Sequence, residues 1–168
     1  GSAEALTSMG TIAAPLLAGF SLAGFVQVLT IGPEDVRWRG APALFLMLAA
    51  IWLILAVQAT FWARQYQVTP SDMTEWWPDW KQPYRARMLR REQEEHNAGF
   101  RRWSRLARVA YELGLLSIIA ALTLLAVPPV STSDTWRWLA VAAGTVAFTA
   151  ELGWGFLALR RPHKKRAA

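Results

Sequence analysis

The run ALFLMLAAIWLILAVQATFWA occupies residues 43–63 and contains no charged side chain. An α-helix needs about 20 such residues to cross the roughly 30 Å of hydrocarbon in a bilayer. The apolar side chains follow one another instead of alternating with polar ones, which favours a helix over a half-buried strand. A helix also satisfies its own backbone hydrogen bonds, which the bilayer interior cannot supply. Residues 43–63 are therefore predicted to form a membrane-spanning helix.

Three further runs of similar length and character lie on either side of this one, at residues 9–31, 109–127 and 138–159. Hydrophobic residues make up 54% of the 168-residue chain and charged residues 18%, below the roughly 25% of soluble domains. We therefore expect an all-α integral membrane protein with four transmembrane helices, forming a single domain over residues 1–168.

The predicted helices differ in the size of their side chains. The first carries small residues, among them Gly10, Ala14 and Ala18, which let another helix approach closely, so we expect it to be an interior helix. Pro15 removes a backbone donor near its start and is expected to bend it. The second is rich in large apolar residues, which favours a peripheral, lipid-facing position.

The third helix is predicted to be longer than its membrane span. The chain reads as helix from Tyr84 onward, and we expect this helix to extend the span into the cytoplasm, with Gly99 as the candidate point of interruption. Pro128 and Pro129 end it. Three polar residues are expected to cap the fourth helix, namely Thr132, Ser133 and Asp134.

Lys and Arg are concentrated in the loop at residues 64–108 and in the C-terminal tail, and only Arg37, Arg39 and Arg137 lie elsewhere. Because basic loops are translocated poorly, this asymmetry places the loop and both termini in the cytoplasm, with the chain in the plasma (inner) membrane. The net charge of +6 follows from these segments. Since they flank the spans, the expected partners are anionic lipid headgroups, each contact contributing about 1 kcal/mol, and not nucleic acid.

The loop has two parts of different character. Trp76, Trp77 and Trp80 lie close together beside Pro78 and are predicted to anchor the loop at the membrane interface, although ligand or partner binding is the alternative. The charged helix that follows is either a solvated stalk or a surface for a protein partner.

Residue types typical of enzymes and metal sites are scarce. The chain has no Cys and only two imidazoles, His96 and His163, which lie far apart in the sequence. We expect no metal site and no cofactor. The sequence also shows no nucleophile with a nearby base and no phosphate-binding loop, so an enzyme is the least favoured class.

Two carboxylates and one amide fall within the cytoplasmic half of the predicted spans. Glu151 lies about 13 Å from the cytoplasmic edge, Gln58 about 9 Å and Glu112 about 6 Å, counted along each helix from the nearest flanking arginine. Ionisable groups at such depth are costly and call for a reason. One hypothesis is a polar cavity or ion path formed by Gln58, Glu112 and Glu151.

The alternative for this polar cluster is structural. Glu112 would pair with Arg105 or Arg108, and Glu151 would bond to Gln58 or Thr149, so that the groups join helices together.

Gln27 lies four residues from the outer end of the first predicted span. In a symmetric oligomer with this helix at its centre, Gln27 would form a ring of amides near the outer mouth, and polar rings at such positions select ions. Interhelical hydrogen bonding explains the residue equally well.

Residues 16–28, LLAGFSLAGFVQV, resemble the pore-lining first helix of the Orai calcium channels. The four-span plan, the cytoplasmic termini and the long extension before the third span are similar too. The resemblance implies a ring of subunits whose first helices line the pore, with Gln27 where that family has its selectivity glutamate. Two departures stand out: Gln27 is uncharged, and Ser8, Met9 and Thr11 replace the family's basic residues at the inner end.

Three functions are therefore open. The first is a subunit of a homo-oligomeric channel or pore with the first helix lining the conduction path. The second is a non-conducting scaffold or anchor that recruits a partner through the basic loop. The third is a small proton-coupled transporter that uses Glu151 as its proton site.

Overall fold

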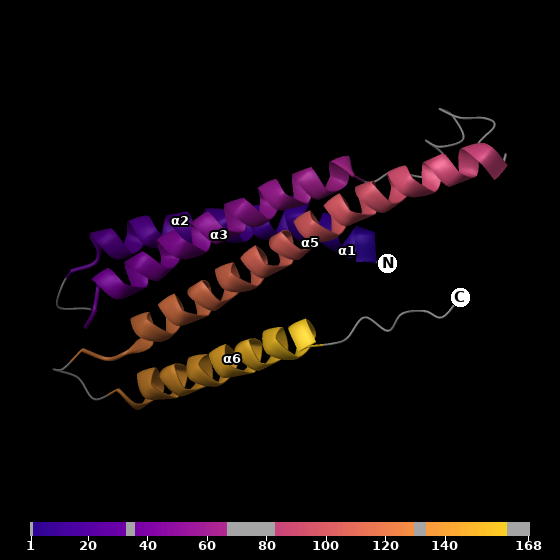
Figure 1. The fold of residues 1–168 in the computed structure, drawn as a ribbon. Helices are drawn as coiled ribbons and strands as arrows, with labels where there is room; N and C mark the ends of the chain where they lie inside the picture. The colour runs from indigo at the N-terminus through magenta and orange to yellow at the C-terminus, as the bar shows by residue number, and fades with distance from the viewer. Residues whose placement is uncertain (1, 33–35, 67–82, 130–133, 161–168) are drawn as a thin grey trace. The chain divides into compact units, whose positions relative to one another are not determined.

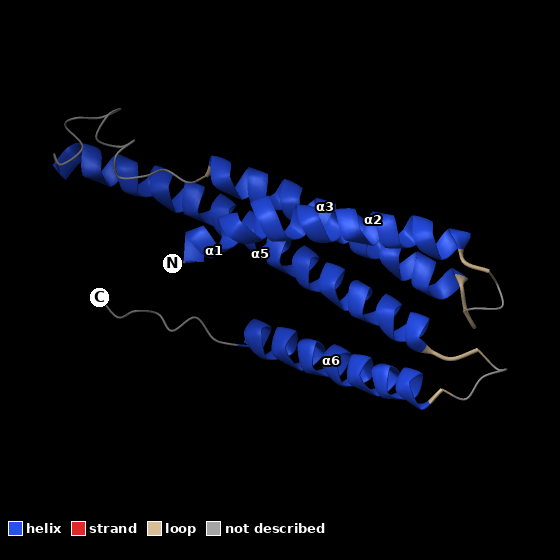
Figure 2. Cartoon of the chain, turned by 180° about the vertical axis from the view of Figure 1, so that it is seen from behind, coloured by secondary structure: helices blue, strands red, loops and turns tan. Residues whose placement is uncertain are grey.

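The structure is a computed structural model that describes residues 2–32, 36–66, 83–129 and 134–160, with side chains described for residues 4–32, 36–66, 97–129 and 134–157. Every regular element in these residues is a helix (Figure 1, Figure 2). The elements are α1 (Ser2–Ser8), the π-helix η1 (Met9–Ala13), α2 (Ala14–Thr30), α3 (Gly40–Gln65), α5 (Pro83–Ala126) and α6 (Thr135–Arg160).

Within these residues, four helical stretches are long and apolar enough to cross a membrane. They are Glu4–Thr30, Gly40–Gln65, Asn97–Ala126 and Thr135–Leu157. The predicted all-α chain with four candidate spans is confirmed. The first candidate span begins at Glu4 and not near residue 9, because α1 and η1 continue the helix in the N-terminal direction.

The fifth element, α5, is a single uninterrupted helix of 44 residues. It begins at Pro83, where a missing N–H costs nothing, and it ends at Ala126, just before Pro128. The predicted interruption at Gly99 is wrong. A Cβ atom at this position would come within 2.8 Å of the Tyr66 ring, so the glycine allows a close approach of Tyr66 and does not break the helix.

The first spanning helix contains a widened turn. The N–H of Ala14 donates to the carbonyl oxygen of Met9, five residues earlier, which closes the π-helical segment η1. Pro15 follows directly and has no N–H to offer the carbonyl of Thr11, four residues before it. The disturbance expected at Pro15 therefore takes the form of one π-helical turn.

The packed side of α3 repeats every seven residues. Leu46, Leu53 and Thr60 form one buried series. Ala49, Ala56 and Ala63 form the second, so the two series alternate at spacings of three and four, as in left-handed coiled-coil packing.

This pattern corrects the predicted peripheral position of the second span. Of the four candidate spans, α3 has the largest buried share. Its large side chains Leu44, Ile51 and Ile54 are indeed exposed, but its alanines form a second face that neighbours approach closely.

The same spacing recurs on α5, where Ala107, Gly114 and Ala121 are seven residues apart and all buried. Both helices thus carry a line of small buried residues at seven-residue spacing, and we call such a line a seam. In α6 the opposite holds, because no residue of Thr135–Leu157 is buried within the chain. Its start is capped as predicted by Asp134, whose Oδ1 accepts the N–H of Trp136 at 3.0 Å, while Thr132 and Ser133 lie outside the described residues.

The chain divides into two compact units whose boundaries fall inside three of the helices. The first unit contains Gly1–Leu16 and Leu53–Tyr111. Its core is a cluster of buried residues with partly buried neighbours: Leu6, Ala59, Ala63, Ala107, Met9, Phe100 and Trp103. Gly10 lies against Thr60 in this unit, so close that the threonine side chain fills the place of a Cβ at residue 10.

The second unit contains Leu17–Trp52 and Glu112–Ala168. Its core consists of the buried residues Val28, Ala43, Leu46 and Ala121, packed against Phe25, Phe45 and Leu125. In this unit α6 runs beside the C-terminal half of α5 (Figure 1, Figure 2). Gly144 of α6 packs against Thr123 of α5, and a larger residue would push the two helices apart.

Candidate functional site

One side of α2 is left uncovered by the rest of the chain. Gly19, Ala23 and Gln27 are spaced four residues apart, which places them in one line along the helix, and all three are exposed. Phe20 beside them is 72% exposed, and no heavy atom lies within 4 Å of a Cβ built on Gly19. An interior helix would be buried on all sides, and the first span is not. The predicted interior position is therefore corrected for the single chain.

The opposite side of α2 packs within its own unit. Ala18, Ser21 and Val28 are buried there, and the Ser21 hydroxyl donates to the carbonyl of Leu17 at 2.8 Å. This contrast orients the helix, because its buried side determines which residues remain on the uncovered side. The uncovered line then consists of two small residues followed by one amide.

The C-terminal turn that carries Gln27 is held by three hydrogen bonds. The Arg39 Nε donates to the carbonyl of Val28 at 3.0 Å, which satisfies one of the carbonyls left free at a helix end. The carbonyl of Gln27 itself accepts the Thr30 hydroxyl at 2.8 Å and the Ile31 N–H at 3.2 Å. The backbone under Gln27 is therefore fixed, while its side chain stays on the exposed side.

A second candidate site joins α5 and α6. Glu112 and Glu151 both lie within candidate spans, both are half-buried, and their carboxyl groups lie next to each other. The Oε2 atom of Glu112 is buried and has no hydrogen-bond partner.

The packing of α6 on α5 explains why these carboxyls meet. Gly144 lies seven residues before Glu151, so both are on the same side of α6. That side contacts α5 at Thr123 and again at Glu112. The glycine thus sets the close approach that places Glu151 beside Glu112.

The structure brings together two members of the predicted polar cluster. Glu112 and Glu151 face each other, as the polar-cluster hypothesis has it, whereas the structural alternative assigned arginines to the first and Gln58 or Thr149 to the second. The Thr149 hydroxyl donates instead to the carbonyls of Thr145 and Val146. Gln58 lies in the other unit and is exposed on α3.

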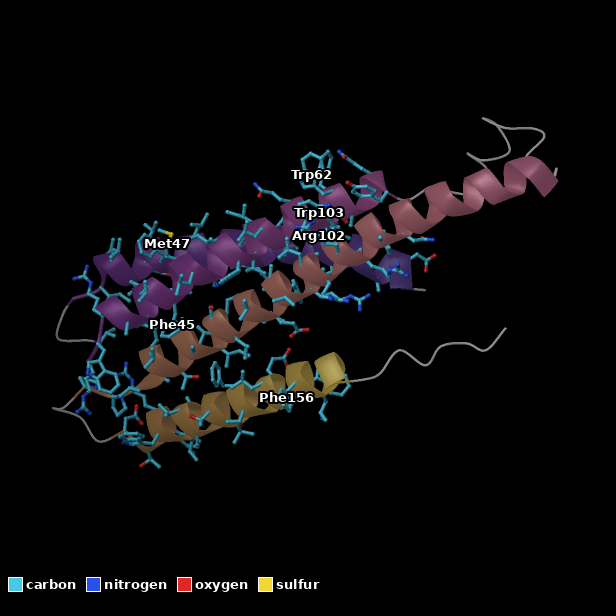
Figure 3. All side chains as sticks on the ribbon, viewed as in Figure 1. Phe45, Met47, Trp62, Arg102, Trp103 and Phe156 are labelled. Carbon is cyan, nitrogen blue, oxygen red and sulfur yellow. The ribbon has the colours of Figure 1, made fainter. Side chains whose placement is uncertain are left out.

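Three aromatic side chains meet near the C-terminal end of α3, and the sequence analysis did not predict this contact. The rings of Trp62 and Trp103, both labelled in Figure 3, are stacked with centroids 6.0 Å apart at 25°. Phe61 meets Trp62 edge-on, with centroids 6.1 Å apart. The stack of Trp62 with Trp103 could not be predicted without knowing that α3 and α5 are neighbours. Three predicted anchors lie outside the described residues: Trp76, Trp77 and Trp80.

Within the part of the chain that the structure describes, no group of three His, Cys, Asp or Glu residues is arranged to hold a metal ion. Comparison with protein-family models, with curated proteins and with solved structures gives no match. The function is therefore inferred from the side chains themselves.

Proposed function

We propose that the chain is the subunit of a homo-oligomeric channel in the plasma membrane, with the uncovered side of α2 lining the pore. In this arrangement both termini and the loop at residues 64–108 face the cytoplasm. The observation that carries the proposal is the uncovered line of Gly19, Ala23 and Gln27 on a candidate membrane span.

An uncovered amide within a span is unfavourable next to lipid, because hydrocarbon offers it no hydrogen bond. A ring of copies around α2 gives each Gln27 amide other amides and water as partners. The small side chains of Gly19 and Ala23 allow the copies to approach closely on the same side of the helix. The resemblance of residues 16–28 to the pore helix of Orai channels supports the same placement.

The ring of amides would favour weak cation discrimination. Amide oxygens coordinate cations through dipoles only, and Gln27 adds no negative charge to the pore. The expected conductance is therefore one of small monovalent cations with little preference for calcium. Replacement Gln27→Glu should increase the relative permeability of divalent cations.

Oligomerisation around α2 is tested by cross-linking, since the chain contains no native Cys. A single Ala23→Cys substitution is expected to give disulfide-linked dimers under mild oxidation in membranes. Ala142→Cys, on an alanine of α6 that is also exposed, is the matched control and should cross-link much less. Equal cross-linking at both positions, or a monomeric protein by mass measurement, would contradict the pore.

Conduction is tested by ion flux from liposomes that contain the purified protein. Gln27→Leu is expected to lower flux at least several-fold, while Gln58→Leu, which removes an exposed amide from α3, should leave it nearly unchanged. Absence of flux for all small ions in the unmodified protein would rule the channel out.

A second candidate function is proton-coupled transport, which the contact between Glu112 and Glu151 favours. Carboxyl groups that face each other within membrane spans are the groups from which proton relays are built. Glu151→Gln would then abolish pH-dependent uptake. Under the channel proposal the same change leaves ion flux in place, so this variant separates the two functions.

A further inference from the structure

Four arginines lie on the exposed part of α5 just before its most apolar stretch. Arg101, Arg105 and Arg108 follow one another at spacings of four and three residues, which places them on one side of the helix, and Arg102 adjoins them. All four are exposed, and the sequence has no acidic residue between positions 97 and 111. From Arg101 to Arg108 this arginine ladder rises about 10 Å along the axis.

The aromatic stack sets the level of the ladder relative to the bilayer. Trp103 lies between Arg102 and Arg105 in sequence and stacks on Trp62, which belongs to the last turn of the candidate span ending at Gln65. Phe61 and Trp62 are 60% and 45% exposed. Tryptophans exposed at the end of a span lie at the headgroup level, so the neighbouring arginines lie there too.

The deepest arginine remains within reach of the same layer. Arg108 is five residues beyond Trp103, about 7.5 Å further along the helix. A long arginine side chain on a spanning helix extends its guanidinium toward the headgroups while its methylenes stay in hydrocarbon. The ladder therefore presents its guanidinium groups over the depth that lipid phosphates occupy.

The surroundings of the ladder are firmly packed. Ala63 of α3 and Ala107 of α5 are buried in one cluster, and Gly99 admits the ring of Tyr66. The backbones of the two helices are thus held together on either side of the Trp62–Trp103 stack. Because the backbone is fixed, the arginines are presented to a ligand without first having to be assembled.

We infer that the arginine ladder and the Trp62–Trp103 stack form a binding site for an anionic phospholipid of the cytoplasmic leaflet. Guanidinium groups bind phosphate oxygens through paired hydrogen bonds, and adjacent tryptophans contact the glycerol and upper acyl region. Charge complementarity and depth both select a lipid, since the stack lies where acyl chains begin. The inference depends on the proposed membrane insertion and orientation and does not depend on conduction.

The test is native mass spectrometry of the full-length purified protein with added phosphatidylglycerol or phosphatidylcholine. The unmodified protein should retain phosphatidylglycerol in preference. The triple variant R101Q/R105Q/R108Q should bind phosphatidylglycerol at least about tenfold more weakly. Its binding of phosphatidylcholine should be unchanged. The control R37Q/R137Q removes two arginines from the other end of the spans and should bind as the unmodified protein does.

Two further arms make the result decisive. Far-UV circular dichroism and size-exclusion profiles verify that each variant is folded, and R101K/R105K/R108K should retain part of the preference because it keeps the charge but loses the paired geometry. Excess inorganic phosphate should fail to displace the lipid. Equal retention of both lipids by the unmodified protein, an unaffected triple variant, or full displacement by phosphate would overturn the lipid site.

The lipid-binding test and the tests of the channel proposal can fail independently of each other. Cross-linking at Ala23→Cys and flux in phosphatidylcholine vesicles report on the pore alone. A protein that conducts but shows no lipid preference would reject only the lipid site, and a protein with the preference but no flux would reject only the channel.

Discussion

Thr60 of α3 occupies the space in which a side chain at residue 10 would lie, so Gly10 and Thr60 form a close helix–helix contact in the first unit. Gly10 belongs to the π-helical turn Met9–Ala13, and Thr60 is fully buried with its hydroxyl donated to the carbonyl of Ala56 at 2.8 Å. The widened turn and the tight contact therefore occur at the same place, and neither residue has room to enlarge.

Gly10→Ala is expected to destabilise the protein by about 1–3 kcal/mol, because the added methyl group overlaps a buried, hydrogen-bonded side chain. Thermal unfolding in detergent, followed by circular dichroism, measures the change. Gly153→Ala is the control, since nothing lies within 4 Å of its added Cβ and alanine is the better helix former. A Gly10→Ala protein as stable as the control would show that the two helices do not approach this closely.

Gly144→Ala is expected to separate α6 from α5, because its Cβ would overlap the Thr123 side chain. The separation should weaken the contact between Glu112 and Glu151 two turns away. Disulfide formation between introduced cysteines, Glu112→Cys and Glu151→Cys, reports the distance. Cross-linking should fall several-fold with Gly144→Ala and stay unchanged with Gly155→Ala, a position with open space.

The contact between Glu112 and Glu151 predicts that a polar and an apolar replacement of Glu151 differ in their effect on stability. Glu151→Gln keeps a partner for Glu112 and should leave the unfolding free energy nearly unchanged. Glu151→Leu leaves a half-buried carboxyl unpaired and should cost about 1–3 kcal/mol. A double-mutant cycle with Glu112→Leu tests the coupling, which should be absent if the side chains do not interact.

The alanine seam of α3 predicts sensitivity to volume and not to hydrophobicity. Ala56 is completely buried, so Ala56→Leu should destabilise by about 1–3 kcal/mol through overpacking, even though leucine is the more lipophilic residue. Ile54→Leu, two residues away on the exposed side, should change stability by less than about 0.5 kcal/mol. Equal effects at the two positions would mean that the seam does not pack as described.

The four candidate spans and their order were readable from the chain, since each run is long and apolar enough by itself. The continuation of the third helix toward Tyr84 and the cap at Asp134 were predictable for the same reason, because both depend on residues a few positions apart. Local sequence patterns gave the wrong result at Gly99. The residue type indicated a break in the helix, but the structure shows a continuous helix and a contact with the Tyr66 ring.

The position of the second spanning helix, α3, was predicted wrongly for a reason that its composition explains. Summed side-chain size on α3 indicated a lipid-facing helix, but the alanines at seven-residue spacing, Ala49, Ala56 and Ala63, form a narrow buried face among larger exposed residues. Hydropathy averages over the whole helix and cannot separate these two faces. A search for small residues at spacings of seven would have revealed the seam.

What the sequence by itself determined is the number and order of the candidate spans, because the free energy of placing a segment in lipid depends on that segment's own composition. Tertiary structure alone decided which side chains meet: Glu112 with Glu151, Trp62 with Trp103, and Gly10 with Thr60. These pairs lie 39, 41 and 50 residues apart in the chain. Their contacts arise only when small residues allow particular helices to pack closely, which no local pattern encodes.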